Sequence, residues 1–305
     1  MSTATAPAPS ISDGLGTFFH ISRFHIIVIA AAAALTFGWI FTGTHLWGLP
    51  LVVGFDWFLV NLLNRVVDLA EDQINGVVGT SFVEQNARNL TWLCFALMVL
   101  SFPVVALIYP PLLWIRGVFH LIGIAYNYKI IPCPSGLNRF KELYFFKNFA
   151  SGVLFILSGI GYPLLAGGAA GLVPPLKVLV LGLFFLAMDL TYEIFYDLRD
   201  LEGDKALGVP TFPVVHGEAG AKRIVVGLLI FAAGILLAGY RGGILAFQEV
   251  VMVAAPLQQY LFYRIKVPRG LTQADCVFVT YLGAAQLLSY NLWVLAGLPL
   301  DLTQL

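Results

Sequence analysis

The chain has 305 residues, of which 59% are hydrophobic and 11% carry a charged side chain, and its mean hydropathy is +0.86. Soluble domains carry about 25% charged residues, so this composition excludes an ordinary soluble fold and predicts an all-α integral membrane protein. The formal net charge is zero and no long basic run occurs. Nucleic acid is therefore not an expected partner, whereas membrane lipid is.

The chain opens on a short polar stretch and continues as a series of long apolar segments. Residues 1–14 are rich in Ala, Pro and Ser and are expected to form a disordered tail, which leaves residues 15–305 as a single transmembrane domain. A helix that crosses the hydrocarbon core needs roughly 20 mostly apolar residues. Nine segments meet this requirement, and the Pro110–Pro111 pair separates the third from the fourth. The nine expected spans are residues 22–42, 49–70, 90–109, 111–130, 145–166, 174–195, 222–240, 243–263 and 275–297.

Lys and Arg are distributed unevenly between the two ends of these spans. With the amino terminus on the inner side, fourteen of these residues fall in inner loops or at inner helix ends and three fall on the outer side, namely Arg116, Lys177 and Arg241. Cytoplasmic loops carry an excess of Lys and Arg. The bias predicts a multi-pass protein, as in a bacterial inner membrane, with its amino terminus in the cytoplasm and its carboxyl terminus outside.

Acidic residues gather at the inner ends of the second and sixth spans, at the same predicted membrane face. The first cluster has a polar residue at every fourth position and the second has aspartates three and four positions apart: Asn64, Asp68 and Asp72, and Asp197, Asp200 and Asp204. Residues at these spacings share one face of a helix. Two such rows facing each other would repel, so we expect a cation between them. Hard oxygen ligands suit Mg²⁺, which also takes phosphate oxygens.

A purely structural account of either cluster is that its carboxylates are solvated helix ends. Two patterned clusters at one face weigh against that account, because ionisable groups at membrane depth are costly and mark function. A cation transporter with acidic rings remains an alternative. Against it, the clusters lie together at one face and no polar path crosses the middle of the expected spans.

The two clusters resemble the Asp-rich motifs of the UbiA superfamily of intramembrane prenyltransferases. The segment from Asn64 to Asp72 resembles the first motif, and the segment from Asp197 to Asp204, followed by Lys-Ala-Leu-Gly-Val-Pro-Thr-Phe-Pro-Val, resembles the second. The resemblance extends over nearly the whole chain. It implies a bundle of nine transmembrane helices with a central cavity, capped on the cytosolic side, which transfers a prenyl group from its diphosphate to a lipophilic acceptor.

The resemblance also implies roles for individual positions, with Mg²⁺ as the cofactor. The implied Mg²⁺ ligands are Asn64, Asp68, Asp72, Asp197, Asp200 and Asp204, and the implied catalytic residues are Asp68, Asp72, Asp197 and Asp200. The expected substrate-binding residues are Asn64, Lys129, Tyr192, Arg139, Lys141 and Lys147, with Lys129 as the first choice for the diphosphate. Each of these cations is equally explained as a positive-inside anchor, and Asn148 is interpreted as a helix-entry residue.

Two positions depart from the family pattern. The first motif is often followed by Asn-Arg-Pro-x-Arg-Pro, but here Asn75 is followed by Gly-Val-Val-Gly-Thr. The second motif usually has Lys before its first aspartate, and here Tyr196 occupies that position. Both changes remove positive charge directed at phosphate. Arg65, Arg88 and Arg199 are candidates to replace it, although Arg65 is equally explained by an ion pair within its own motif.

The resemblance implies Mg²⁺-assisted ionisation of an allylic diphosphate to a carbocation, which aromatic faces would stabilise by roughly 0.5 to 2 kcal/mol each. With an acceptor the product is a prenylated lipid; without one the cation cyclises, so a terpene cyclase is the alternative enzyme. Asp56 and Asp189 lie deeper in the second and sixth spans. Either could orient an acceptor or take up the final proton, or else pair with His25, His120 or Arg116.

Overall fold

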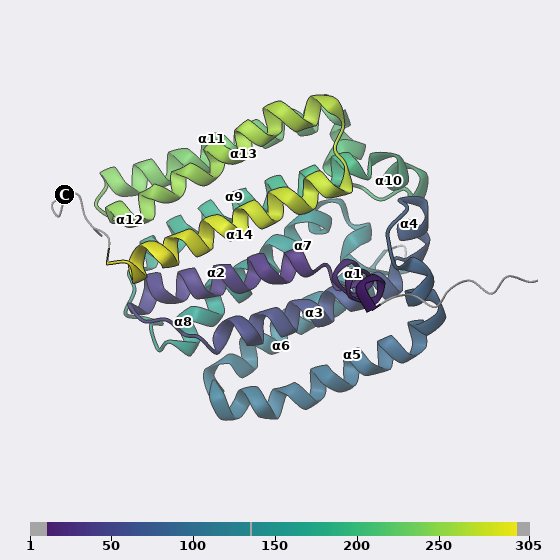
Figure 1. The fold of residues 1–305 in the computed structure, drawn as a ribbon, viewed down its shortest axis with the longest axis horizontal. Helices are drawn as coiled ribbons and strands as arrows, with labels where there is room; N and C mark the ends of the chain where they lie inside the picture. Colours follow the sequence, from purple (N-terminus) through teal and green to yellow (C-terminus); the bar gives the residue numbers. More distant parts are fainter. Residues whose placement is uncertain (1–10, 135, 298–305) are drawn as a thin grey trace, which may run out of the picture.

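The computed structural model describes residues 11–134 and 136–297, and it consists almost entirely of α-helices (Figure 1). The α-helices are α1 (Ile11–Ile21), α2 (Phe24–Thr42), α3 (Leu49–Val67), α4 (Leu69–Ile74), α5 (Thr80–Ile108), α6 (Leu113–Asn127), α7 (Tyr144–Ile156), α8 (Tyr162–Ala166), α9 (Pro175–Arg199), α10 (Leu201–Leu207), α11 (Phe212–Arg241), α12 (Phe247–Val250), α13 (Ala254–Lys266) and α14 (Gln273–Leu295).

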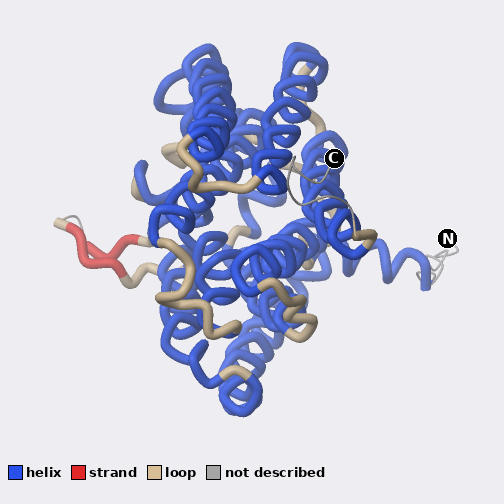
Figure 2. Tube along the Cα trace, turned by 90° about the vertical axis from the view of Figure 1, so that its left-hand side faces the viewer, coloured by secondary structure: helices blue, strands red, loops and turns tan. Residues whose placement is uncertain are grey.

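Short elements join these helices. A π-helical segment, η3 (Leu157–Gly161), links α7 to α8, and strands β1 (Ile131–Cys133) and β2 (Gly136–Asn138) pair antiparallel. The hairpin that they form projects from the bundle (Figure 2). The 3₁₀ turns are η1 (Pro110–Leu112), η2 (Phe140–Glu142), η4 (Val251–Val253) and η5 (Val267–Arg269).

Within the described residues, seven helical stretches are long and apolar enough to cross a membrane: α2, α3, α5, α9, α11, α14 and the joined stretch Phe146–Ala166. An all-helical, multi-pass integral membrane protein is therefore confirmed. The expected spans 111–130 and 243–263 contain the shorter helices α6 and α13, of 15 and 13 residues. The proline pair delays the start of α6, and η4 separates α12 from α13.

Two helices begin about three turns earlier than hydropathy indicates, because their first turns are polar. α5 begins at Thr80 and α11 at Phe212, where the expected spans begin at 90 and 222. α11 bends at Gly217, whose φ of 70° lies in the left-handed region that glycine tolerates. Residues 1–10 of the expected tail lie outside the described residues, and residues 11–14 belong to α1.

The long helices run side by side, and helices from the two ends of the chain are neighbours (Figures 1 and 2). α2 packs against both α3 and α14, and α9 packs against α7 and α11. Thr36 Oγ1 of α2 donates to the Leu287 carbonyl oxygen of α14 at 3.0 Å and accepts a hydrogen bond from Asn291 Nδ2 at 2.7 Å. α4 and α10 contact each other at the right-hand end of the bundle in Figure 1.

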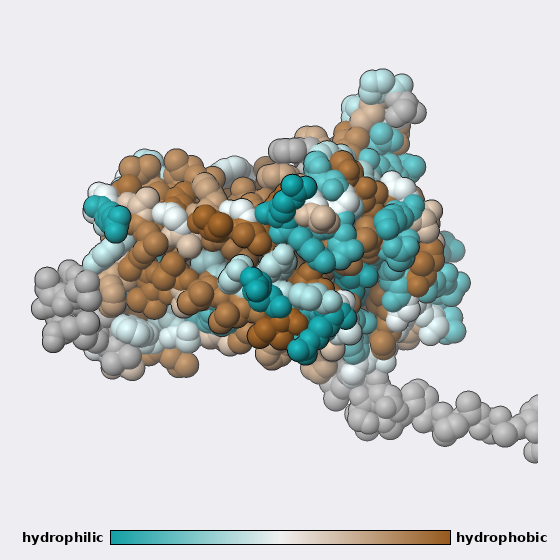
Figure 3. Space-filling model, turned by 90° about the horizontal axis from the view of Figure 1, so that it is seen from above, coloured by the Kyte–Doolittle hydropathy of each residue, from teal (hydrophilic) through white to brown (hydrophobic). Residues whose placement is uncertain are grey.

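The face of the molecule seen in Figure 3 is largely apolar away from that end. Polar side chains gather at the end that carries α4 and α10, whereas hydrophobic side chains cover much of the remaining face (Figure 3). Helix α5 leaves most of its apolar side chains uncovered, with Leu107 87% exposed. A continuous exposed apolar surface of this kind requires lipid as its solvent.

One buried polar cluster holds α3, α5, α6 and α8 together. Arg116 of α6 is fully buried, and its guanidinium bonds both carboxylate oxygens of Asp56. His120 Nε2 and the Tyr162 hydroxyl reach the same carboxylate at 3.1 and 3.0 Å, and Arg116 also donates to Ser101 Oγ. Arg116 thus neutralises a buried acid inside the bundle, and its bond to Asp56, like that of His120, is the pairing that the sequence left open as an alternative.

Candidate active site

Each Asp-rich motif spans a break between a long helix and a short one. α3 ends at Val67 and α4 begins at Leu69, so Asp68 stands between them with φ −94° and ψ 21°. Asp200 occupies the same place between α9 and α10, with φ −93° and ψ 10°. The amides of Asp68 and Asp72 still bond the carbonyls four residues back, at 2.9 Å each. The backbone turn that aligns each motif on one face therefore continues through the break.

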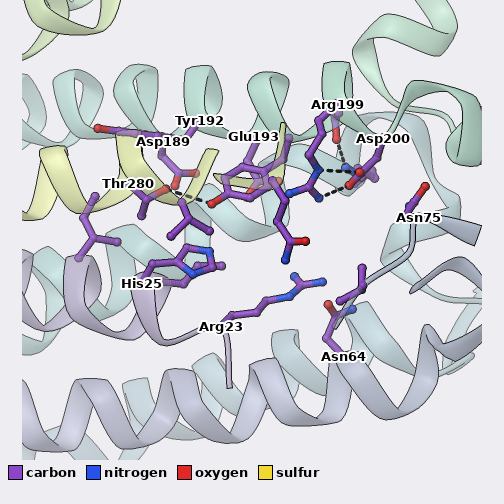
Figure 4. A pocket seen from close by; sticks show the side chains of 18 of the residues that line it. Arg23, His25, Asn64, Asn75, Asp189, Tyr192, Glu193, Arg199, Asp200 and Thr280 are labelled. Carbon is purple, nitrogen blue, oxygen red and sulfur yellow. Dashed lines mark hydrogen bonds and ion pairs between the residues drawn. The ribbon is translucent and has the colours of Figure 1, made fainter. Parts of the chain in front are cut away.

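The contact between α4 and α10 brings the two motifs to opposite walls of one pocket of about 1190 Å³, which we call the polar pocket (Figure 4). Five of the six expected Mg²⁺ ligands line it: Asn64, Asp72, Asp197, Asp200 and Asp204. The sixth, Asp68, lines a smaller adjoining pocket of about 580 Å³, together with Glu71 and Lys141. Glu71 and Lys141 line both pockets, so the two spaces are neighbours.

Asp68 is neutralised by two cations from the loop before α7. Lys141 Nζ lies 2.6 Å from Asp68 Oδ2 and also contacts Glu71, and Arg139 Nη1 lies 3.0 Å from Asp68 Oδ1. Burial opposes ionisation of Asp68, but the charges of Lys141 and Arg139 outweigh it and hold the pKa of this carboxyl below its ordinary value. The two carboxylates in turn raise the pKa of Lys141 against the effect of burial.

Asp197 is held by two neighbouring residues at the start of α7. Lys147 Nζ forms an ion pair with Asp197 Oδ1, and Asn148 Nδ2 donates to Oδ2 at 2.7 Å. Both side chains are buried. Asn148 does lie near the start of α7, but the interpretation that it is a helix-entry residue and no more is wrong, because its amide binds an acidic motif residue. No sequence signal distinguished it from a solvated helix end.

The remaining motif aspartates differ in how they are neutralised. Arg65 Nη1 lies 2.8 Å from Asp72 Oδ1, which is the ion pair within the motif that the sequence left open. Arg199 pairs with the adjacent Asp200. Asp204 is buried, and its Oδ2 has no hydrogen-bond partner among the described residues. Burial and the neighbouring carboxylates raise the pKa of Asp204 to about 7, against the opposing charge of Lys147. This oxygen is thus available to a cation that the chain itself does not supply.

Asn64 lies inside the candidate site, whereas Lys129 lies outside it. Asn64 Nδ2 donates to Asp68 and also to Asn127 Oδ1, the latter at 3.1 Å, so it sits inside the site. Lys129 is 64% exposed, does not line the polar pocket, and lies 3.3 Å from Glu142. Tyr128 adopts an extended conformation after α6 ends, which carries the chain away from the pocket. The first choice for a diphosphate contact is thus not at the site in this structure.

Arg23 is a cation in the pocket wall that sequence reasoning did not single out. It joins α1 to α2 with φ 50°, the one positive φ at a non-glycine position among the described residues. Its guanidinium points into the polar pocket between Asn64 and Arg199 (Figure 4). No ion pair or hydrogen bond of this side chain is found in the described part of the chain. The only sequence signal is its place directly before the first span.

An apolar pocket of about 870 Å³ adjoins the polar pocket. It lies between α9, α13 and α14, and the two pockets share Ile29, Phe185, Met188 and Tyr192 in their walls. Tyr192, an expected substrate-binding residue, therefore stands where polar lining gives way to apolar lining. The combined space can take a molecule with a strongly anionic head and a long hydrocarbon chain.

A helical bundle in the membrane, with two opposed acidic motifs at one end of a space that is polar near the motifs and apolar beyond them, has the architecture of an intramembrane enzyme. The model of the UbiA prenyltransferase family matches residues 24–280, so the chain belongs to this family and is a prenyltransferase. The family membership expected from the two motifs is thereby confirmed.

The similar proteins agree with this assignment. A digeranylgeranylglyceryl phosphate synthase from Methanoregula boonei is 30% identical over 257 residues, covering 79% of this chain and 86% of that protein. An enzyme of the same name from Methanopyrus kandleri is 37% identical over 93 residues, and this chain spans about a third of its length (34%). A UbiA homologue from Archaeoglobus fulgidus, solved with GPP and Mg²⁺, has the same fold with TM-score 0.69 at 18% identity, covering 92% of this chain and 99% of that one.

Proposed function

We propose that this protein transfers a prenyl group from its diphosphate to a lipophilic acceptor, with Mg²⁺ as cofactor. One observation carries the proposal: two acidic motifs face each other across the polar pocket, and that pocket adjoins an apolar one. The diphosphate occupies the polar pocket and the hydrocarbon chain extends along the apolar lining. The GPP and Mg²⁺ in the homologue from Archaeoglobus fulgidus support this choice of ligands.

The residues of the polar pocket fit Mg²⁺. They offer carboxylate oxygens from two sides, including the unpartnered Oδ2 of buried Asp204. No group of three or more His, Cys, Asp or Glu side chains converges on one point within the described residues, but Mg²⁺ usually takes one or two carboxylates and completes its shell with water and substrate phosphate oxygens. Asn64, Asp68 and Asp72 would hold it on one side, and Asp197, Asp200 and Asp204 on the other. It would supply positive charge to the leaving diphosphate.

The chain itself contributes positive charge and an aromatic lining to the polar pocket. Arg23 is free to bind a phosphate oxygen, and Lys141 and Lys147 can move from their carboxylates to phosphate once a cation takes over those carboxylates. Phe155, Phe185 and Tyr192 line the pocket wall, where their π-faces stabilise positive charge developing on the prenyl carbon. This aromatic lining would keep water away from the carbocation, which water would otherwise capture as an alcohol.

The membrane arrangement follows from the same site. We infer that α6 and α13, together with their flanking turns, complete nine crossings in residues 15–305 around a central cavity. The basic residues of the inner loops and the positive-inside rule favour a cytoplasmic position for the acidic end. The protein would then be a multi-pass protein of a bacterial inner membrane, drawing diphosphate from the cytoplasm and acceptor from the lipid.

The test uses purified full-length protein in lipid nanodiscs with Mg²⁺ and geranylgeranyl diphosphate labelled at C1. A digeranylgeranylglyceryl phosphate carries two prenyl groups on one glyceryl phosphate, so geranylgeranylglyceryl phosphate is the acceptor probe. We expect labelled lipid and released diphosphate from the wild type, and a loss of about 100-fold or more in Asp68→Asn and Asp197→Asn or on chelation of Mg²⁺. Glu218→Gln, an exposed carboxylate at the start of α11, is the matched control.

Diphosphate release that survives chelation and both aspartate variants would contradict the proposed site. Release accompanied by a cyclic hydrocarbon, with no prenylated lipid, would instead identify a terpene cyclase.

A further inference from the structure

Three acidic residues of α9 line the polar pocket on one face of the helix. Asp189, Glu193 and Asp197 are spaced four residues apart, or about one helical turn. Asp197 lies nearest the end of α9, Glu193 lies one turn deeper in the membrane, and Asp189 lies deepest. Only Asp197 belongs to the motif that the proposed Mg²⁺ site uses. The two deeper acids lie beyond it, toward the residues that the polar and apolar pockets share.

Helix α7 meets these three acids with partners of decreasing strength. Asp197 receives the ammonium of Lys147, and Glu193 receives a hydrogen bond of 2.9 Å from Ser151 Oγ. Asp189 meets Gly152, where an added Cβ would come within 3.3 Å of Asp189 Oδ2. Along this helix pair the chain therefore supplies a cation, then a hydroxyl, then no side chain at all.

Asp189 is left without a partner in a buried position. It is 7% exposed, its Oδ2 is buried with no hydrogen bond, and no ion pair involves it within the described residues. Asp56 shows that the fold can neutralise an acid at membrane depth, because Arg116, His120 and Tyr162 all bond it. A buried polar group without a partner is costly. The missing partner of Asp189 therefore indicates that this carboxyl binds a ligand and does not serve to hold the helices together.

We propose that Asp189 and Glu193 bind the hydroxyl group of a lipid alcohol acceptor and take up its proton during transfer. The proposal rests on the proposed function and names the acceptor class for the same site. The carboxyl of Asp189 lies on the wall of the polar pocket, beside Tyr192 and Glu193 (Figure 4). A hydroxyl placed there lies inside the pocket, on the membrane side of the diphosphate, with the acceptor's hydrocarbon in the apolar pocket.

The pair can hold one proton before the reaction and two after it. Two carboxylates one turn apart, with no cation between them, do not both ionise at membrane depth. Asp189 holds the proton and donates a hydrogen bond to the acceptor oxygen, and Glu193, nearer Lys147, is ionised. The acceptor oxygen supplies the electron pair of the new bond to prenyl C1, and the C1–O bond breaks with its pair leaving on diphosphate. The hydroxyl proton passes to Glu193.

The decisive variants are Asp189→Asn and Glu193→Gln, which keep the shape of each side chain. We expect transfer to geranylgeranylglyceryl phosphate by Glu193→Gln to fall by about 100-fold or more, in the range for loss of a general base. Transfer by Asp189→Asn should fall less, because the new amide still donates a hydrogen bond to the acceptor oxygen. Mg²⁺-dependent binding of geranylgeranyl thiodiphosphate, which is not ionised, should stay within about twofold of the wild type, because neither residue belongs to the motifs. Transfer by Glu193→Gln within about threefold of the wild type would overturn the proposal.

Thermal stability separates this role from a structural one. Asp56→Asn is the matched control, because it removes a buried carboxylate that has three partners and should lower the unfolding midpoint. Asp189→Asn should leave the midpoint unchanged or raise it, since it removes an unpaired buried acid. A fall in midpoint equal to that of Asp56→Asn would overturn the assignment.

An infrared comparison tests the pair without any acceptor. The wild type should show a protonated carboxyl band that is missing from Asp189→Asn, and its absence from the wild type would overturn the proposal. Wild-type protein that fails to bind the thiodiphosphate in Mg²⁺ would count against the proposed function instead.

Discussion

Two lysines of the segment between α6 and α7, Lys129 and Lys141, contact different partners although both follow an apolar span. Lys141 is buried between Asp68 and Glu71, whereas Lys129 extends into solvent beside Glu142. Both were expected to contact the diphosphate. Their different places follow from the turn after α6 and the β1–β2 hairpin, which direct one side chain outward and return the other to the motif.

Replacing Lys141 by alanine should therefore impair the enzyme, whereas replacing Lys129 should not. Lys141→Ala leaves Asp68 and Glu71 with one cation fewer and removes a phosphate contact, so we expect the KM for the prenyl diphosphate to rise about tenfold or more. Lys129→Ala removes an exposed pair, which is worth little, and should leave KM within about twofold. Steady-state kinetics over a range of diphosphate concentrations measures both; equal effects of the two variants would contradict the placement of Lys141.

The acidic residues were predictable, and an ion pair of Arg65 within its own motif was among the alternatives, but the partners that come from distant segments were not predictable. Asn64, Asp68 and Asp72 follow a local helical repeat, which the sequence displays directly. Asn148 and Arg23 reach the site through tertiary packing, from the start of α7 and from a left-handed turn before α2. Contacts between distant segments leave no periodic signal in one sequence, so an inner-loop cation can be located on a membrane face but not on a particular carboxylate.

At the scale of helices, close contacts shape the pocket as much as charges do. Gly283 of α14 stands against α9 and α2, where a Cβ would collide with the Tyr192 hydroxyl and come within 3.1 Å of Ile29 Cδ1. Tyr192 and Ile29 both line the polar and the apolar pocket. The missing side chain at position 283 thus allows Tyr192 its present place at the junction.

Gly283→Ala should displace the Tyr192 ring and narrow this junction. Overpacking of this kind costs about 1–3 kcal/mol, so we expect the KM for geranylgeranyl diphosphate to rise roughly tenfold. The double variant Gly283→Ala with Tyr192→Phe removes the colliding hydroxyl and should recover most of the loss. Gly227→Ala, on α11 where a Cβ meets nothing within 4 Å, is the control. A double variant no better than Gly283→Ala alone would exclude the proposed collision.

Helix boundaries show where hydropathy stops being informative. The apolar centres of the long helices were located correctly, because lipid demands about 20 apolar residues of any crossing. The polar first turns of α5 and α11 carry no such demand and were missed. α6 is preceded by a 3₁₀ turn and α13 is flanked by two, and the bonding pattern of such turns depends on neighbours rather than on composition.

The whole molecule has one polar end, and the proposed orientation puts that end in the cytoplasm. Leu137 in the β1–β2 hairpin and Leu172 between α8 and α9 are both exposed, on opposite sides of the proposed nine crossings. In a Cys133→Ser background, where the two remaining cysteines are buried, we expect Leu172→Cys in intact bacterial cells to react with an impermeant maleimide. Leu137→Cys should react only after permeabilisation. The reverse pattern would invert the proposed topology.

The bonds between Thr36 and the last long helix also set an order for assembly. Thr36 meets Leu287 and Asn291 across 251 and 255 positions of the chain, and Thr280 of the same helix completes the pocket wall. During synthesis both acidic motifs therefore enter the membrane before the helix that encloses them exists. Until α14 inserts, the acid-lined groove faces lipid or the insertion machinery, and a chain that stops short of α14 is left with an open, charged seam. Quality-control proteases that recognise polar groups within the bilayer would remove such a fragment.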